Sequence, residues 1–225
     1  MKRKKWQILL EDRIKEYLKN TGGCHDYWHA IRVEGNAKKI ASKIKCDPDV
    51  LSAAAFLHDV GYHGNDDHKM HYLYSMKLAE KWLPDIGFPK NKMKDTLEAI
   101  RLHDNYSWGH NYEPTGHVET KIIQDADRID ALGAIGVVRF TYFFGEKNFP
   151  IYSSKPPKKT NEVWLYHSLI DQLRRDPMQK WSHLNYEYSK KISKKKFEFL
   201  KKFYNELHKE ILNYHDDWET ENAKT

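Results

Sequence analysis

Apolar side chains recur three and four positions apart along most of this chain, which is the spacing of helices that bury one face. Runs in which apolar and polar residues alternate are scarce, so the pattern predicts no strand. We therefore expect an all-α fold. The predicted helices cover residues 6–19, 26–44, 48–58, 71–83, 90–104, 117–130 and 184–214.

Residues that start or stop helices divide these segments. Gly22 and Gly23 follow the first predicted helix, and Asp47-Pro48 separates the second from the third. Pro84 is expected to end the fourth helix. The sixth helix is expected to continue over residues 131–139, where small side chains suit close contact between helices.

Three segments have a distinctive composition. Residues 51–57 read Leu-Ser-Ala-Ala-Ala-Phe-Leu, which predicts a helix at the centre of the fold because it is apolar on nearly every side. Residues 149–159 hold three of the eight prolines and are expected to form a long loop. The apolar stripe of residues 200–212 is expected to pack in the core, and the lysines on the opposite face are either solvated or steer anions.

Length and composition exclude several classes of protein. With 225 residues and 40% hydrophobic side chains, the chain is long enough for one large domain and too apolar to be disordered. No apolar run approaches the roughly 18 residues of a membrane helix. Glu11 and Asp12 interrupt the N-terminal apolar stretch that a signal peptide needs, so we expect a cytoplasmic protein. Cys24 and Cys46 are too few for a disulfide framework or a four-thiolate zinc site.

The net charge of +6 is small and uneven. Residues 151–225 contain 15 basic and 11 acidic side chains, so most of the excess lies in the last third. This balance allows an anionic small molecule as a partner, but it is far from the composition of a dedicated nucleic-acid-binding protein.

Histidines concentrate in the first half of the chain, where nine of the 13 fall between residues 25 and 117. A histidine directly followed by an aspartate ends the apolar third helix, at His58-Asp59, and buried groups of both types need partners. A divalent metal satisfies both. Together with His29 and Asp127 the pair would form a shell of nitrogen and oxygen ligands, suited to manganese, iron, nickel, cobalt or zinc.

Helical spacing supports convergence of these groups. His25, His29 and Arg32 share one face of a helix, and Asp127 and Asp130 lie three apart on another. Arg32 and Arg128 are close in sequence to proposed ligands, and planar guanidinium groups suit phosphate recognition.

The order His29, His58-Asp59, Asp127 resembles the signature of the HD-domain superfamily of metal-dependent phosphohydrolases. The phrases HDYWHAIRV, AAFLHDVGYHG and QDADRIDALGAIG look like those of small stand-alone bacterial members. The resemblance covers residues 22–140 of a predicted single-domain protein, 1–225, and leaves residues 141–225 as a helical extension. It implies an all-α fold with a metal among central helices, and it places the metal-ligand role on His29, His58, Asp59 and Asp127.

Two positions depart from the branch of this superfamily that cleaves cyclic dinucleotides. That branch has a lysine after the glycine of its HD-x-G segment and a paired His-His further on, whereas this chain has Tyr62 and His103-Asp104. His103 is then a candidate for a second metal or for a substrate phosphate. His63, His68 and His71 flank the HD pair, and loop histidines without a ligand role are the commoner case.

We therefore expect a metal-dependent phosphohydrolase whose substrate is a nucleotide or a similar small phosphorylated metabolite. Asp59 is the first choice for general base, because one oxygen can ligate while the other accepts a proton. The residues expected to act in catalysis are Asp59, Arg32, His103 and Arg128. The residues expected to contact the substrate are Arg32, Lys69, His103 and Arg128.

Two other functions compete with this one. The chain could be a non-catalytic module that senses a metal or a nucleotide, or it could bind nucleic acid through its lysine-rich C-terminal face. Tyr106, Trp108 and Tyr112 could stack a base, although packing of their own loop is the commoner role of such aromatics.

Overall fold

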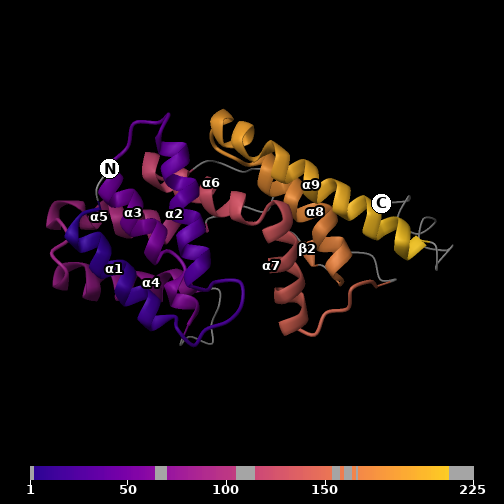
Figure 1. Cartoon of the computed structure of the whole chain (residues 1–225), viewed down its shortest axis with the longest axis horizontal. Coiled ribbons are helices and arrows are strands. Elements are labelled where there is room, and N and C mark those ends of the chain that lie inside the picture. The colour runs from indigo at the N-terminus through magenta and orange to yellow at the C-terminus, as the bar shows by residue number, and fades with distance from the viewer. Residues whose placement is uncertain are drawn as a thin grey trace. The chain divides into compact units, whose positions relative to one another are not determined.

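The structure is a computed structural model that describes residues 3–63, 70–104, 115–153, 158–159, 164–165 and 167–212 (Figure 1). The α-helices are α1 (Lys5–Tyr17), α2 (Tyr27–Ala41), α3 (Pro48–Leu57), α4 (His71–Asp85), α5 (Met93–Leu102), α6 (Val118–Asp130), α7 (Gly133–Glu146), α8 (Leu169–Ser182) and α9 (Glu187–Leu212). Two short 3-10 helices, η1 (Val60–Tyr62) and η3 (Lys90–Lys92), precede α4 and α5. The all-α prediction is confirmed. Across the described ranges, the helices are all too short or too polar to span a bilayer.

One pair of strands was not predicted. β1 (Lys158–Lys159) and β2 (Trp164–Leu165) pair antiparallel, with Lys158 opposite Leu165. Alternation of apolar and polar residues cannot develop over two positions, so the sequence pattern carries no signal for strands this short.

The chain divides into two compact units. Among the described residues, unit 1 contains 3–63, 70–104, 115–130 and 185–189, and unit 2 contains 131–153, 158–159, 164–165, 167–184 and 190–212. The boundary between α6 and α7 corrects the expected continuous helix over residues 131–139. Gly133 has a φ of 75°, a left-handed conformation that favours glycine, so α6 ends at Asp130 and α7 starts anew.

In unit 1, α3 lies at the centre, as its composition predicts. Nine of its ten residues are buried, all but Pro48, and the helix contacts α1, α2, α4, α5 and α6. Asp47 caps its start by accepting hydrogen bonds from the backbone of Asp49 and Val50, and Pro48 occupies the first turn, where its missing N–H costs nothing. Helix α2 packs against α3 and α6. These contacts bring the start of α2, the end of α3 and the end of α6 together.

Helix α4 extends past the predicted stop at Pro84 to Asp85. A proline in the last turn costs one hydrogen bond. The backbone N–H groups of Gly87 and Phe88 still reach the carbonyls of Pro84 and Leu83, at 3.1 and 3.0 Å.

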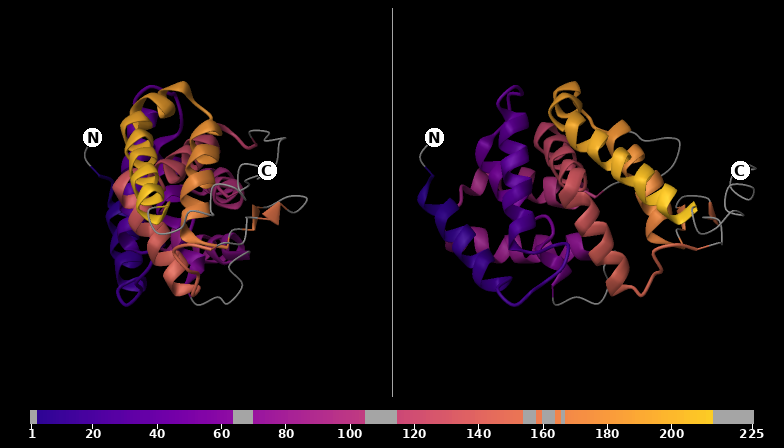
Figure 2. Two further views of the ribbon diagram at one scale, coloured as in Figure 1. Left: turned by 90° about the vertical axis from the view of Figure 1, so that its right-hand side faces the viewer. Right: turned by 45° about the vertical axis from the view of Figure 1, so that its right-hand side comes forward.

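In unit 2, α7, α8 and α9 lie side by side in both views (Figures 1 and 2). Their core contains Phe140 and Phe144 of α7, Leu173 of α8 and Leu200 of α9. Phe203, Tyr204 and Leu207 pack against this core, which confirms the core role predicted for the α9 stripe. Residues 150–151, which follow α7, are hydrogen-bonded to the first turn of α8. The carbonyls of Pro150 and Ile151 accept hydrogen bonds from the N–H groups of Leu169 and Ile170.

Candidate metal centre

The histidine and aspartate side chains that stand out in the sequence converge inside unit 1. His29 lies in the first turn of α2, and His58-Asp59 directly follows α3. Asp127 lies in the last turn of α6. His71 starts α4, and His103 directly follows α5. The site is therefore assembled from the ends of five helices, where side chains can meet without interrupting the packed middles of those helices.

Local backbone interactions fix two of these positions. Asp26 caps α2, and its carboxylate accepts the N–H of His29 at 2.8 Å. The turn after Asp59 is pinned against α4, because the N–H of Gly61 donates to Ser75 Oγ at 2.9 Å. A Cβ at position 61 would lie 2.1 Å from the carbonyl oxygen of His71, so only glycine allows this approach.

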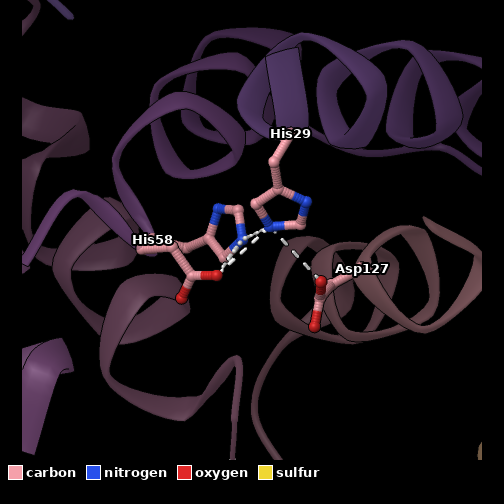
Figure 3. A group of neighbouring side chains, drawn as sticks. His29, His58 and Asp127 are labelled. Carbon is pink, nitrogen blue, oxygen red and sulfur yellow. Dashed lines mark hydrogen bonds and ion pairs between the residues drawn. The ribbon is translucent and has the colours of Figure 1, made fainter. Parts of the chain in front are cut away.

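The first group of donors is the predicted one: His29, His58, Asp59 and Asp127 (Figure 3). One ligand atom from each lies within 4.8 Å of the others. His29 Nε2 lies 3.2 Å from His58 Nε2, 3.2 Å from Asp59 Oδ2 and 3.5 Å from Asp127 Oδ1. The histidines and Asp59 are buried, and the Asp127 side chain keeps 16% exposure. This group can hold one divalent ion and remains open on the Asp127 side.

A second group shares Asp59 with the first. Asp59 Oδ1 lies 3.0 Å from His103 Nε2 and 3.3 Å from His71 Nε2, and these two nitrogens are 3.2 Å apart. Asp59 Oδ2 faces His58 and His29 at 3.3 and 3.2 Å. Each carboxylate oxygen therefore faces its own pair of imidazoles. The expectation that Asp59 acts as general base, with one oxygen ligating and the other accepting a proton, stays a prediction.

The protonation of the rings supports cation binding. Nδ1 of His58 and of His103 lies 2.9 and 2.6 Å from the carbonyl oxygens of Ala55 and Ile100, and His29 Nδ1 lies 2.8 Å from an Asp130 oxygen. Each Nδ1 therefore donates a proton to an oxygen, and a neutral ring then presents the lone pair of its Nε2 to the cluster. Two such nitrogens 3.2 Å apart require a positive charge in the cluster, which is either a proton shared with Asp59 or a metal ion.

The electrostatics follow from the same contacts. Burial alone would raise the pKa of Asp59, but the facing His58, His103 and His29 rings hold that pKa well below its usual range. Burial would lower the pKa of His103, but its hydrogen bond with Asp59 raises that pKa. Asp59 is thus held as a carboxylate, the form in which it ligates a metal.

Asp130 contacts the cluster but is not part of the ligand signature. It is fully buried, and its carboxylate accepts the Nδ1 proton of His29 and two hydrogen bonds from Arg32, at 2.7 and 3.1 Å. Its position three residues after Asp127 is the signal in the sequence. Arg32 is therefore committed to Asp130, and 31% of its side chain is exposed beside the site.

His71 and His25 are the other residues beyond the signature. Tyr62 is stacked between them, with ring centroids 3.9 Å from His25 and 4.1 Å from His71 and near-parallel planes. His71 is buried at the start of α4 within the second donor group, which corrects the expectation of an exposed loop position. His25 Nε2 lies 3.8 Å from Asp59 Oδ2. The tyrosine thus separates two imidazoles that face opposite oxygens of one carboxylate.

The structure places Arg128 away from the proposed ligands. Its side chain is 1% exposed and forms an ion pair with the buried Asp125, at 3.7 Å. Asp125 in turn accepts hydrogen bonds from the backbone of Asn185 and Tyr186. The arginine is one residue from Asp127, a rotation of about 100° around the helix, and this turns it into the core. The burial and ion pair of Arg128 favour a structural role, and its expected contact with substrate stays a prediction.

The remaining candidates have other surroundings or lie outside the described residues. His63 Nε2 contacts the carbonyl oxygen of His25, and His117 Nδ1 contacts Glu119. The candidates that fall outside the described ranges are Lys69, His68, His110, Tyr106, Trp108 and Tyr112.

Comparison with known proteins agrees with this geometry. Residues 27–132 match the family model of the HD domain. The chain is 25% identical over 213 residues to the uncharacterized protein YpgQ of Bacillus subtilis, covering 94% of this chain and 96% of YpgQ. The crystal structure of YpgQ in complex with ADP superposes with a TM-score of 0.71 and 21% identity, covering 92% of this chain and 95% of YpgQ. A predicted HD superfamily hydrolase from an uncultured Thermotogales bacterium gives a TM-score of 0.59 and 25% identity, covering 90% and 91% of the two chains.

Proposed function

Because residues 27–132 form an HD domain, we propose that this protein is a metal-dependent phosphohydrolase that acts on a nucleotide or a similar small phosphorylated metabolite. The observation that carries the proposal is the shared carboxylate of Asp59, which faces two imidazoles from each of its oxygens. Four imidazole nitrogens and one bridging carboxylate directed at the same small volume are a donor set that suits divalent cations.

Two cation positions follow from this arrangement. His29, His58, Asp59 and Asp127 would hold the first ion, and Asp59, His71 and His103 would hold the second. A divalent metal at such a site lowers the pKa of bound water and polarises a phosphoryl oxygen, which makes hydrolysis possible at neutral pH. The donor set of imidazole and carboxylate suits manganese, iron, nickel, cobalt or zinc.

The protein's own groups orient these donors. Asp130 and the carbonyls of Ala55 and Ile100 accept the Nδ1 protons of three imidazoles, which orients the opposite nitrogens toward the cluster, where they would ligate. We assign Arg32 to the binding of the substrate. It pairs with Asp130, and 31% of its side chain remains exposed. His103 then serves the second cation position rather than a phosphate.

The nucleotide part of the proposal rests on two supports. YpgQ, which aligns with nearly the whole chain, was crystallised with ADP, and a guanidinium beside the metal donors suits a phosphate. Release of a terminal phosphate and release of pyrophosphate from a triphosphate are both compatible with this site.

The test is turnover of a panel of nucleoside mono-, di- and triphosphates with Mn²⁺, scored separately for phosphate and pyrophosphate. We expect hydrolysis of at least one class and no hydrolysis by Asp59→Ala. Tight nucleotide binding without turnover of any member would refute the phosphohydrolase and favour a sensor module. Hydrolysis that persists in Asp59→Ala would show that the activity does not come from this site.

A further inference from the structure

A cavity in unit 1 is lined by residues other than the metal donors. It has a volume of about 500 Å³ and is formed by the chain before α1, the C-terminal half of α2 and the start of α3. That volume is in the range of small-molecule sites. On α2 the lining residue nearest to His29 is Glu34, five residues further along, which is about 8 Å along the helix axis and about 140° around it. The lining contains none of the metal donors, so the cavity is a site separate from the metal centre.

One wall of the cavity is apolar. It consists of Ala37, Ala41, Ile44, Pro48 and Leu51. Ala37 and Leu51 are buried, and the small alanine side chains on α2 leave the space between the two helices open. Such a wall accepts the apolar body of a ligand, because it removes that body from water without needing hydrogen bonds.

The floor of the cavity holds two buried carboxylates that are already satisfied. Glu34, 4% exposed, accepts from Ser52 Oγ at 3.0 Å and pairs with Arg3 and Lys38 at 3.2 and 2.6 Å. Asp49, 3% exposed, pairs with Lys4 and Lys92 at 2.6 and 2.7 Å. Each of the two acids therefore has two cationic partners. A cationic ligand would have to displace these partners and leave buried charge unpaired.

The rim of the cavity presents an excess of hydrogen-bond donors. Arg3, Lys4, Lys38 and Lys45 line it, against the two acids. The side chains of Lys4 and Lys38 remain about half exposed in spite of their ion pairs. Lys45 is exposed and has no acidic partner within the part of the chain that the structure describes. Arg3, Lys4 and Lys38 are themselves ion-pair partners of the two acids, and Arg3 also pairs with Glu11, so Lys45 is the lining cation that no acid neutralises among the described residues. The four lining cations still exceed the two lining acids, which favours a ligand that brings acceptors and negative charge.

From this combination we propose that the cavity binds a small organic anion with an apolar body, the anionic group lying at the basic rim and the body lying against the α2–α3 wall. The site is independent of the metal centre, and its test needs no hydrolytic activity.

The test compares two probes with the same ring system. 8-Anilinonaphthalene-1-sulfonate carries a sulfonate, and N-phenyl-1-naphthylamine lacks it. Fluorescence titration of the full chain should give one anilinonaphthalenesulfonate per chain, with affinity at least fivefold higher than that of the uncharged probe. Cys46 lines the cavity and is half-buried, so its alkylation by iodoacetamide, followed by mass spectrometry, reports on occupancy. Saturating probe should protect Cys46.

Three variants sharpen the result. Lys45→Glu reverses a rim charge on the surface and should weaken the anionic probe about fivefold. Ala41→Trp fills the cavity and should abolish binding; Lys45→Glu keeps the test decisive if the tryptophan impairs folding. Lys43→Glu is the matched control, an exposed lysine that does not line the cavity, and should bind like the wild type. Equal affinity for both probes, unprotected Cys46, or equal weakening by Lys43→Glu and Lys45→Glu would each overturn the proposal.

Discussion

Asp130→Asn is the substitution that most directly tests how this fold prepares a metal ligand. The wild-type carboxylate accepts the Nδ1 proton of His29 and two donors of Arg32, so it faces three N–H groups with two oxygens. Asparagine keeps the shape but replaces one oxygen with an NH₂ group. In one orientation the NH₂ faces His29, which drives the imidazole proton to Nε2 and removes the ligating lone pair. In the other orientation the NH₂ faces Arg32, and two donors oppose each other.

The size of the effect follows from the role of such partners. Carboxylates that orient a metal-binding imidazole change metal affinity about 10- to 100-fold, which corresponds to about 1.4 to 2.8 kcal/mol. We expect a loss of this size in Mn²⁺ affinity, because the Asp130 carboxylate is buried and no water can replace it.

Isothermal titration calorimetry of metal-stripped protein with Mn²⁺ measures this loss. Arg32→Gln is the matched control, since it removes the other partner of Asp130 but leaves the acceptor for His29, and it should lose less than about threefold. Thermal unfolding in EDTA separates affinity from stability. If Asp130→Asn binds Mn²⁺ within twofold of the wild type while folded, Asp130 does not orient His29 and the reasoning is wrong.

The remaining predictions concern other parts of unit 1. Asp59→Ala should lose both cation positions, so elemental analysis should find no retained metal and no nucleotide should be hydrolysed; metal content equal to that of the wild type would contradict the bridging role. Tyr62→Leu should weaken metal binding at the second cation position, because it removes two ring stacks worth about 0.5–1.5 kcal/mol each. Tyr62→Phe keeps both stacks and should bind metal there like the wild type. The number of metal ions bound per chain in the two variants is the measurement. Gly61→Ala should cost about 1–3 kcal/mol in the free energy of unfolding, as its Cβ would meet the His71 carbonyl at 2.1 Å, and an unchanged melting temperature would show that the turn can move. Burial acts to raise the pKa of Asp49, but its ion pairs with Lys4 and Lys92 hold that pKa below its usual value. The pKa of Asp49 is therefore lower in the folded chain than in the unfolded chain. The ionised side chain stabilises the fold above about pH 4, and this stabilisation is lost as the pH falls further. Asp49→Asn should therefore destabilise the protein by about 1–2 kcal/mol at pH 7 in denaturant titrations, and the difference from the wild type should shrink towards pH 3; a difference that is constant with pH would refute the ionic origin.

Much of the fold could be predicted from periodicity alone. The composition of residues 51–57 identifies the central helix, because a helix that is apolar on all sides has no face for water. The break between α6 and α7 was not predicted, since the small side chains there are compatible with a continuous helix and only the backbone angle of Gly133 distinguishes the two. The strands β1 and β2 are too short to have a period.

Part of the site could be predicted from the order of its ligand residues along the chain. His29, His58, Asp59 and Asp127 follow a recognisable order, and the structure brings them together. His71 follows a segment that lacks helical periodicity, so its burial depends on the close approach of Gly61 to α4, which no local pattern reveals. Arg128 and Arg32 look equivalent in sequence, but Arg128 on α6 forms a buried ion pair with Asp125, whereas Arg32 on α2 pairs with Asp130 and stays partly exposed.

The facing lone pairs of the cluster connect metal binding to the folding equilibrium. The donors come from residues 29 to 127, so their chain segments must be folded together before the lone pairs meet, and the unfolded chain offers no comparable site. A ligand that binds only the folded state stabilises it by about 2.7 kcal/mol at a free concentration one hundred times its dissociation constant. The melting temperature of unit 1 should therefore rise with the concentration of free divalent metal, and its lifetime in a cell depends on metal supply as well as on its hydrophobic core.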